Sequence, residues 1–276
     1  MSVNVGEVMV FEGLRYSQPG AQELFLDLHR PKGTKHPVPV ALYLHGGAFV
    51  EGDKSADVER IRGLAEHGVA VASVNYRLAP ETGPKEVLED VSAAISWVSD
   101  QGEEYGLRTD NIGLWGASAG AHIAAKAGME LKQGTTPGIL TQIGAVVCWF
   151  GLYDFVLSSR RTALEGALLP SGPEANLLGA AGSSGSESFE TEALFDASVY
   201  SSVDSDVPPF FFMHGDSDHM VPYSESESLH HALRRSGARS NLMLLGGAGH
   251  EDSAFDEPPV LSAVAAFFKH WLSPAE

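Results

Sequence analysis

The amino-acid sequence predicts an α/β fold, in which a mostly parallel central sheet carries helices on both faces. Short apolar runs rich in Val, Ile, Leu and Phe alternate along the chain with longer segments of helical periodicity. Most of these runs are continuously apolar, which is typical of strands covered on both faces. Strands that alternate with helices are joined by right-handed parallel crossovers, so we expect the ligand site beyond the carboxyl ends of the strands.

The predicted strands follow one another at regular intervals. Glu23–Leu28 alternates polar and apolar residues, as a half-exposed strand does, whereas Val38–Leu44 is nearly all apolar and ends at His45. The other predicted strands are short and apolar: Val69–Val74, Ile112–Trp115, Ile143–Trp149, Phe210–His214 and Asn241–Leu245. The predicted helices between them are Ser55–His67, Lys85–Ser99, Ala119–Leu131, Tyr223–Arg235 and a last one near Pro259–Leu272.

One long segment interrupts this alternation. Residues 152–207 lack a clear strand and contain the small, polar run Gly179–Ser188. We predict that they form a lid insertion over the site, part helix and part loop. No linker rich in Pro, Gly or Ser separates two hydrophobic patterns, so residues 1–276 are expected to form a single domain.

Composition narrows the classes of partner. The chain has 18 Lys and Arg against 36 Asp and Glu, a formal net charge of −18. Such an acidic surface repels phosphate backbones and anionic lipid heads, so we expect neither a nucleic-acid nor a membrane partner. The single cysteine, Cys148, excludes an intramolecular disulfide and a cluster of thiolate metal ligands. Because it lies in an apolar run, it is expected to be buried and inert.

The first eleven residues, Met1–Phe11, show no basic segment followed by an apolar stretch. No apolar run in the chain is long enough to span a bilayer. We therefore expect a cytoplasmic protein.

Gly116–Gly120, with the sequence GASAG, fits the pattern Gly-x-Ser-x-Gly. A predicted strand runs directly into it and an Ala-rich helix runs directly out, which is the context of a nucleophilic serine on a tight strand-to-helix turn. Glycines are needed on either side of the serine because a Cβ there would collide with the neighbouring strand or helix. The sequence predicts that Ser118 is a nucleophile.

A serine hydroxyl needs an imidazole base, and the imidazole needs an acid that fixes its tautomer. His250 stands apart from the other histidines because it lies between a glycine-rich loop after Asn241–Leu245 and the last helix. The strand before, Phe210–His214, ends in GDSD, which offers two acids. We favour Asp218, while Asp216 could instead hold the turn by bonding its own backbone.

Attack on an ester carbonyl develops negative charge on its oxygen, which backbone N–H groups stabilise. The first expected donor is the N–H of Ala119, directly after the nucleophile. The second is expected from Gly47 or Ala48, in the loop that follows an early buried strand. His45 is expected to brace this loop.

These motifs together resemble the hormone-sensitive-lipase-like branch of the α/β-hydrolase superfamily. The resemblance rests on His45–Phe49 (HGGAF), Asn75–Glu81 (NYRLAPE), Gly116–Gly120, the spacing Asp218-x-x-Val221-Pro222, and His250. It implies the α/β-hydrolase fold, a triad of Ser118, Asp218 and His250, and an oxyanion hole of Gly47, Ala48 and Ala119. Ester hydrolysis by such a triad is expected to need no cofactor or metal.

Two departures from that branch refine the expectation. Ala48 replaces the usual third glycine, as in bacterial feruloyl or acetyl esterases and kynurenine formamidases. Only a short segment precedes the first strands, too little for the N-terminal cap of two helices seen in many relatives. The lid must then come from residues 152–207 or be minimal, which disfavours a long-chain lipase and favours a small or open acyl site.

The favoured function is therefore a carboxylesterase that cleaves small-molecule esters. An amidase or arylformamidase would use the same triad, and a ligand-binding protein that lost its chemistry, as gibberellin receptors did, is disfavoured because all three triad positions are filled. Phe49, Trp149 and Tyr153 could line an aromatic acyl or alcohol pocket. An edge strand or the last helix could also pair in a homodimer.

Overall fold

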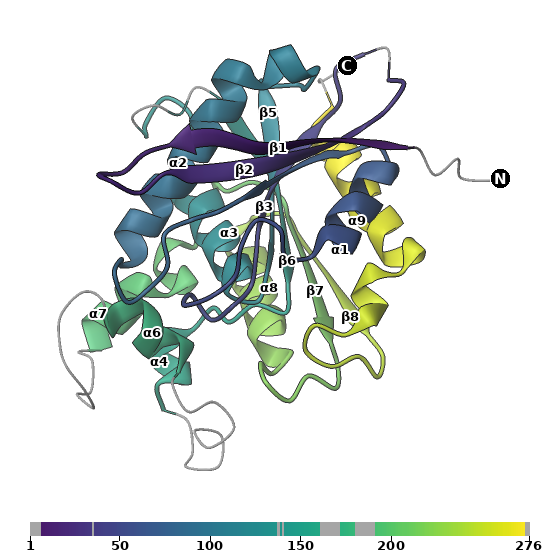
Figure 1. Ribbon diagram of the computed structural model, residues 1–276. Coiled ribbons are helices and arrows are strands. Elements are labelled where there is room, and N and C mark those ends of the chain that lie inside the picture. Colours follow the sequence, from purple (N-terminus) through teal and green to yellow (C-terminus); the bar gives the residue numbers. More distant parts are fainter. Residues whose placement is uncertain are drawn as a thin grey trace.

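A twisted sheet of eight strands runs through the computed structural model, which describes residues 7–34, 36–136, 139, 141–160, 172–179 and 191–273 (Figure 1). The strand order is β1-β2-β4-β3-β5-β6-β7-β8. Strands β3 to β8 are parallel, whereas β2 is antiparallel to both β4 and β1. The strands are β1 (Val8–Ser17), β2 (Leu24–Pro31), β3 (Val40–Leu44), β4 (Ala70–Val74), β5 (Asn111–Ala117), β6 (Gln142–Trp149), β7 (Phe210–Gly215) and β8 (Ser240–Leu245). The predicted mostly parallel sheet is confirmed.

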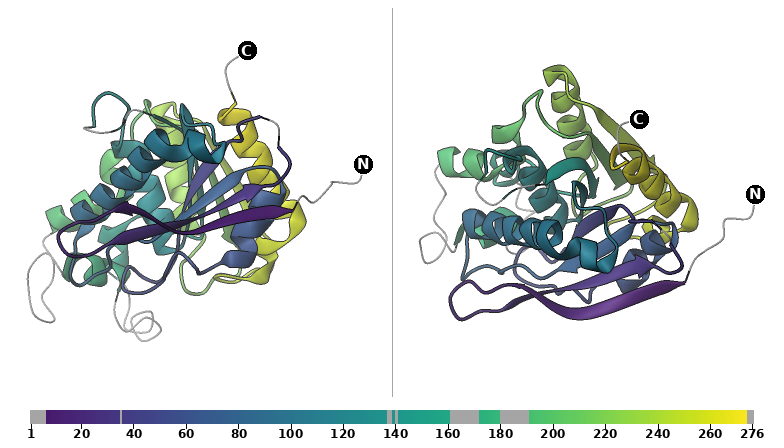
Figure 2. Two further views of the ribbon diagram at one scale, coloured as in Figure 1. Left: turned by 45° about the horizontal axis from the view of Figure 1, so that its top comes forward. Right: turned by 90° about the horizontal axis from the view of Figure 1, so that it is seen from above.

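Helices cover both faces of this sheet (Figures 1 and 2). One face carries α2 (Pro84–Gln101), α3 (Ala119–Glu130) and α8 (Ser224–Ser236), and the other carries α1 (Val58–Glu66) and α9 (Pro258–Trp271). Successive side chains of a strand point to opposite faces. In β3, Leu42 and Leu44 join the core under α2 and α3, while Ala41 and Tyr43 join the core under α1 and α9. Burial on both faces explains why these strands are continuously apolar.

The edge strands differ most from the prediction. Strand β1 was not predicted, because its residues are only partly buried and its pairing with β2 shifts register between Phe11 and Leu14. A bulge of this kind breaks the regular alternation by which an edge strand is recognised. Strand β8 was predicted, but it forms the other edge, where Leu244 is 42% exposed.

Between β6 and β7 the described residues form short helices that gather at one end of the sheet (Figure 1). They are α4 (Phe155–Ser158), α6 (Pro173–Gly179), α7 (Thr191–Ala197) and the 3₁₀ helix Val199–Ser202. Lys126 of α3 anchors this segment, because its ammonium group donates to the carbonyls of Asp196 and Ser198 at 2.7 and 2.9 Å. This is the region of the predicted lid; residues 161–171 and 180–190, with most of the polar run Gly179–Ser188, lie outside the described residues.

Cys148 lies in β6 and is fully buried, as predicted, and this burial raises the pKa of its thiol. In the described part of the chain, no helix has the length and apolar character that crossing a membrane requires. Residues 1–6, which belong to the segment inspected for a leader, are outside the described residues.

Candidate active site

Ser118 lies on the tight turn between β5 and α3, with φ 52° and ψ −117°. A non-glycine residue with positive φ is strained and is held there by its surroundings. A Cβ on Gly116 would collide with the backbone of Gly120, and a Cβ on Gly120 would collide with the carbonyl of Leu44 in β3. The two glycines therefore allow β5, α3 and β3 to pack closely enough to form the turn.

His250 lies in the loop between β8 and α9 and bridges two of the predicted residues. Its Nε2 is 3.0 Å from the Oγ of Ser118, and its Nδ1 is 2.7 Å from Oδ2 of Asp218. The ring of Phe150 packs against the imidazole, with ring centroids 4.8 Å apart. The structure thus brings Ser118, His250 and Asp218 into one hydrogen-bonded line.

Asp218 follows β7 and is buried. Its Oδ1 accepts hydrogen bonds from the backbone N–H groups of Met220 and Val221, both at 2.9 Å. Burial by itself would raise the pKa of this carboxyl. Hydrogen bonds from His214, His250 and Val221 outweigh that effect and hold the pKa well below its usual value. The carboxylate is therefore ionised throughout the neutral range.

Asp216, the alternative acid, has a different place. It is exposed, and its Oδ1 accepts hydrogen bonds from the N–H of Gly247 at 2.6 Å and from the hydroxyl of Ser217 at 3.0 Å. It therefore ties the loop after β7 to the loop after β8, and the described structure gives it no contact with His250.

The loop after β3, His45–Phe49, which we call the glycine loop, lies against Ser118. A Cβ placed on Gly46 would be 3.4 Å from the Cβ of Ser118. The next residues, Gly47, Ala48 and Phe49, all have positive φ, at 114°, 49° and 69°. On the other side of the serine, Ala119 begins α3, and the N–H groups of a helix's first turn have no intrahelical acceptor. The loop after β3 and the first residue of α3 therefore both lie next to Ser118.

Two side chains and one backbone group hold this loop. Tyr76 donates its hydroxyl to the carbonyl of His45 at 2.8 Å and stacks on the His45 ring at a centroid distance of 4.4 Å. The N–H of Ala79 donates to the carbonyl of Phe49 at 2.8 Å, and Asn176 of α6 donates to the carbonyl of Ala48 at 3.1 Å. Burial lowers the pKa of His45, so a neutral His45 ring lies under the loop.

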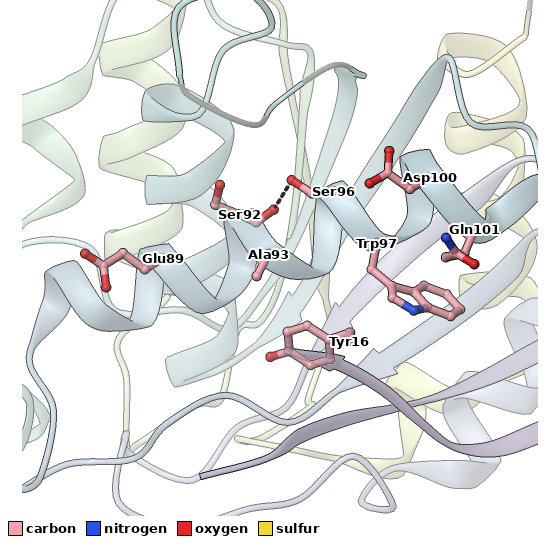
Figure 3. A pocket seen from close by; sticks show the side chains of 8 residues that line it. All are labelled: Tyr16, Glu89, Ser92, Ala93, Ser96, Trp97, Asp100 and Gln101. Atoms are coloured by element: carbon pink, nitrogen blue, oxygen red, sulfur yellow. Dashed lines mark hydrogen bonds between the residues drawn. The ribbon is translucent and has the colours of Figure 1, made fainter. Parts of the chain in front are cut away.

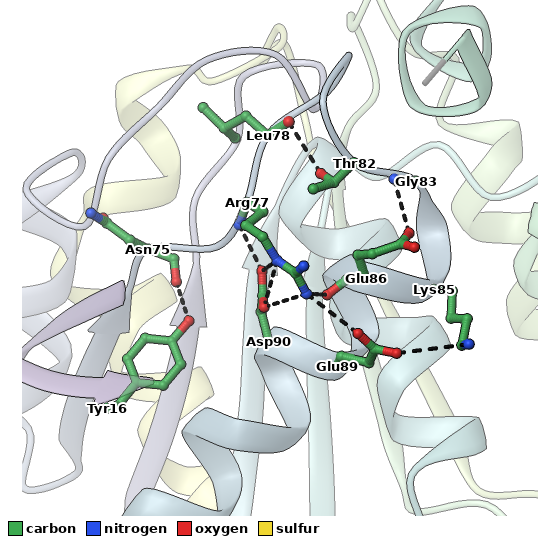
Figure 4. A network of polar contacts seen from close by, with 10 residues as sticks. All are labelled: Tyr16, Asn75, Arg77, Leu78, Thr82, Gly83, Lys85, Glu86, Glu89 and Asp90. Atoms are coloured by element: carbon green, nitrogen blue, oxygen red, sulfur yellow. Dashed lines mark hydrogen bonds and ion pairs between the residues drawn. The ribbon is translucent and has the colours of Figure 1, made fainter. Parts of the chain in front are cut away.

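Tyr76 and Ala79 belong to the NYRLAPE segment, Asn75–Glu81, which is hydrogen-bonded to α2 through Arg77 (Figure 4). The Nε of Arg77 lies 2.9 Å from both carboxylate oxygens of Asp90, and its Nη2 donates to the carbonyl of Glu86 at 2.8 Å. These hydrogen bonds raise the pKa of the Arg77 guanidinium. Tyr16 of β1 donates to the carbonyl of Asn75. The motif thus connects the glycine loop to the core.

The three aromatic residues predicted to line a pocket are all buried. Trp149 is fully buried under α1 and α9, edge-on to Trp115 with ring centroids 4.9 Å apart and covered by the guanidinium of Arg60. Phe49 and Tyr153 are also buried, at 1% and 0% exposure. A contact with substrate stays a prediction for all three residues.

Two residues near the triad were given no functional role from the sequence. Glu251 has a φ of 54°, and its Oε1 lies 3.0 Å from where a Cβ of Gly46 would be, which places a carboxylate at the edge of the serine site. His214, in β7, contacts Asp218 with Nε2 3.3 Å from Oδ2. The signal for Glu251 was its position directly after His250, whereas His214 could have been suspected because it precedes GDSD.

A cavity of about 450 Å³ lies elsewhere, between β1 and α2 (Figure 3). Its lining is formed by Tyr16, Glu89, Ser92, Ala93, Ser96, Trp97, Asp100 and Gln101. None of the candidate catalytic residues borders it. Within the described residues, no group of three or more His, Cys, Asp or Glu side chains is arranged to hold a metal ion.

The sheet order, the helices on both faces and the serine turn after the central strand β5 define an α/β-hydrolase fold. The chain belongs to the BD-FAE family, whose match covers residues 26–233. The isoprenylcysteine α-carbonyl methylesterase ICME of Arabidopsis thaliana is 31% identical over 84% of this chain and 55% of its own length. Esterase LipQ of Mycobacterium tuberculosis is 31% identical over 80% of this chain and 52% of its own.

The chain therefore spans about half the length of the curated relatives it matches. Among solved structures, a truncated carbohydrate esterase from gut microbiota is 25% identical, with a TM-score of 0.80 and 97% of both chains covered. Esterase B of Lactobacillus rhamnosis is 20% identical, with a TM-score of 0.78 over 96% of this chain and 85% of its own, and this likeness shows the fold alone.

Proposed function

We propose that the protein is a carboxylesterase that hydrolyses small carboxylic esters through Ser118, His250 and Asp218, by way of an acyl-enzyme. The observation that carries this proposal is the continuous line from Ser118 Oγ through both nitrogens of His250 to Asp218 Oδ2. The relatives named as esterases support the same class of reaction.

In acylation, Ser118 Oγ adds to the ester carbonyl carbon while its proton passes to Nε2 of His250. Asp218 accepts the hydrogen bond of Nδ1–H, so the ring stays in the tautomer whose Nε2 can take a proton, and the imidazolium that forms is stabilised. The N–H groups of Ala119 and of Gly47 or Ala48 stabilise the negative oxygen of the tetrahedral intermediate. When the intermediate collapses, His250 returns the proton to the departing oxygen, the C–O bond breaks and the alcohol leaves.

In deacylation, His250 removes a proton from water, and the hydroxide adds to the acyl carbon. The second intermediate breaks the bond to Ser118, whose oxygen regains the proton, and the carboxylic acid departs. The sequence of steps consumes one water and needs no other reactant.

The first test is hydrolysis of p-nitrophenyl esters from acetate to laurate by the wild type and Ser118→Ala. Ser205→Ala is the matched control, because Ser205 borders a cavity at the amino-terminal ends of β5 and β6. We expect activity on short chains that is lost in Ser118→Ala and kept in Ser205→Ala. Folded protein without activity on any ester would overturn the proposal and direct the next assay to N-formyl aromatic amides.

Cytoplasmic location and a homodimer formed through an edge strand or α9 stay predictions. Size-exclusion chromatography with light scattering tests the second, and a mass of one chain, 29.3 kDa, would contradict it.

A further inference from the structure

His214 is a fully buried histidine of β7 whose two ring nitrogens both have partners. Its Nδ1 is 2.8 Å from the hydroxyl of Ser226 on α8. Its Nε2 is 2.9 Å from the carbonyl of Val221 and 3.3 Å from Oδ2 of Asp218. The carboxylate oxygen that faces His250 therefore also faces a second imidazole.

The partners determine which nitrogen of His214 carries the proton. The carbonyl of Val221 and the carboxylate of Asp218 can only accept, so Nε2 must be the donor. The hydroxyl of Ser226 can donate to Nδ1. A ring that carries a proton on Nε2 satisfies both of the contacts that this nitrogen makes.

We infer that His214 is a positioning residue that acts on His250 through Asp218, because the Nε2–H that it donates to the Val221 carbonyl also lies 3.3 Å from Oδ2 and stabilises the charge there. This inference rests on the proposed function for its kinetic consequence but not for its structural one. Oδ1 is held independently by the N–H groups of Met220 and Val221, so the carboxylate keeps its place when His214 is replaced. Replacing His214 changes the strength of the attraction between Oδ2 of Asp218 and the imidazole of His250.

The charged groups near Asp218 determine whether replacing His214 strengthens or weakens this attraction. Among the described residues, Asp218 makes its ion-pair contacts with His214 from β7 and His250 from the loop before α9. The carboxylate of Glu225, next to Ser226 on α8, accepts from the backbone N–H groups of Tyr153 and Asp154. Removing the donor from His214 leaves Asp218 with a stronger attraction for the imidazolium form of His250, so His250 will hold its proton to a higher pH.

The decisive variant is His214→Phe, which keeps a buried ring and removes the donor. We expect the acid limb of the pH–kcat profile to move upward by about 0.5 to 1 pH unit, the usual effect of one hydrogen bond. Activity at a fixed pH on that limb then falls about threefold to tenfold, while KM is unchanged because His214 does not reach the substrate. His214→Gln, whose amide can donate to the same oxygens, should restore the wild-type limb.

The matched control is His230→Phe. His230 also bonds a serine hydroxyl through Nδ1, that of Ser240 at 2.8 Å, but at the start of β8, away from the triad. His230→Phe should leave the acid limb of the pH–kcat profile unchanged.

The same proposal is tested without turnover by ¹⁵N NMR of the imidazoles, with the His250 and His214 signals identified by their loss in His250→Asn and His214→Gln. In the wild type at neutral pH, His214 should carry a proton on Nε2, and this measurement does not depend on His214→Phe. The titration midpoint of His250 should rise in His214→Phe. A proton on Nδ1 of His214, or a His250 midpoint that stays or falls in folded His214→Phe, overturns the inference. Absence of ester hydrolysis in the wild type would refute the proposed function and leave the NMR result to decide the role of His214.

Discussion

The two aspartates of the GDSD loop offer a sharp test, because they are two residues apart and have different contacts. Asp218 Oδ2 is 2.7 Å from Nδ1 of His250, whereas Asp216 accepts from the backbone of Gly247. Replacing each by asparagine removes one negative charge and changes almost no volume. If Asp218 is the acid, Asp218→Asn will lower kcat far more than Asp216→Asn, although the two substitutions change side-chain charge and volume equally.

The expected magnitudes follow from what each oxygen does. In Asp218→Asn, an amide NH₂ turned toward His250 forces the proton onto Nε2, which then cannot accept from Ser118. A wrong tautomer of this kind costs about 10³- to 10⁴-fold in kcat, or about 4 to 5.5 kcal/mol in activation free energy. In Asp216→Asn, the amide oxygen can still accept from Gly247. We expect kcat to change by less than about threefold and the free energy of unfolding to fall by at most about 1 kcal/mol.

The assay is kcat and KM for p-nitrophenyl butyrate at pH 8, with Ser118→Ala as the background and urea denaturation of every variant. If Asp216→Asn loses the activity and Asp218→Asn keeps it, the acid assignment is wrong. If both lose it, the unfolding free energies separate a collapsed loop from a catalytic effect.

Three further predictions concern packing, pH and charge. Gly120→Ala should destabilise the fold by at least about 2 kcal/mol in urea denaturation, because its Cβ would collide with the Leu44 carbonyl; a loss no larger than that of Gly246→Ala, whose Cβ would have room, would contradict the close-packing argument. Burial lowers the pKa of His122 from 6.5 to about 4, so the unfolded chain takes up a proton at a higher pH than the folded chain does. The free energy of unfolding therefore falls by up to about 3 kcal/mol as the pH falls from 6.5 to 4. His122→Gln should therefore flatten the pH dependence of the unfolding free energy, and parallel curves for wild type and variant would refute this. Glu251→Gln should raise kcat/KM for an ester of a dicarboxylic acid about threefold to tenfold over its neutral analogue, an effect that shrinks with salt; equal changes for both substrates would remove Glu251 from the site.

The sequence predicted best the features that the backbone alone determines. The serine turn needs glycine at two fixed positions, so Gly116 and Gly120 identify it without any knowledge of side-chain packing. The strands β3 to β7 are buried on both faces, so their continuous apolar runs are visible in one dimension. His250 and Asp218 could be selected because they follow predicted strands and parallel strands bring those ends together.

What the sequence left open depends on which face of the sheet a side chain lies on. Trp149 ends β6 next to Cys148, and the two point to opposite faces. The period of a strand places Trp149 with Val147 and Ala145, but it does not say that this face is the one closed by α9. The contact between His214 and Asp218 is likewise set by the loop that returns Asp218 onto its own strand. Such contacts are fixed by tertiary packing, which local patterns do not encode.

The structure also explains why the NYRLAPE segment accompanies the glycine loop although it contributes no residue to the triad. Three successive residues of the glycine loop, Gly47, Ala48 and Phe49, have positive φ. Ala48 and Phe49 are not glycines, so they keep this conformation only because their surroundings enforce it. Tyr76 from this segment and Asn176 from the insertion supply hydrogen bonds to two of the loop's carbonyls. The geometry of the proposed oxyanion hole therefore depends on the core on one side and on the insertion on the other. A substrate that displaces α6 would alter the oxyanion donors as well as the space for its own groups, so selection by the insertion would act on kcat and not on KM alone.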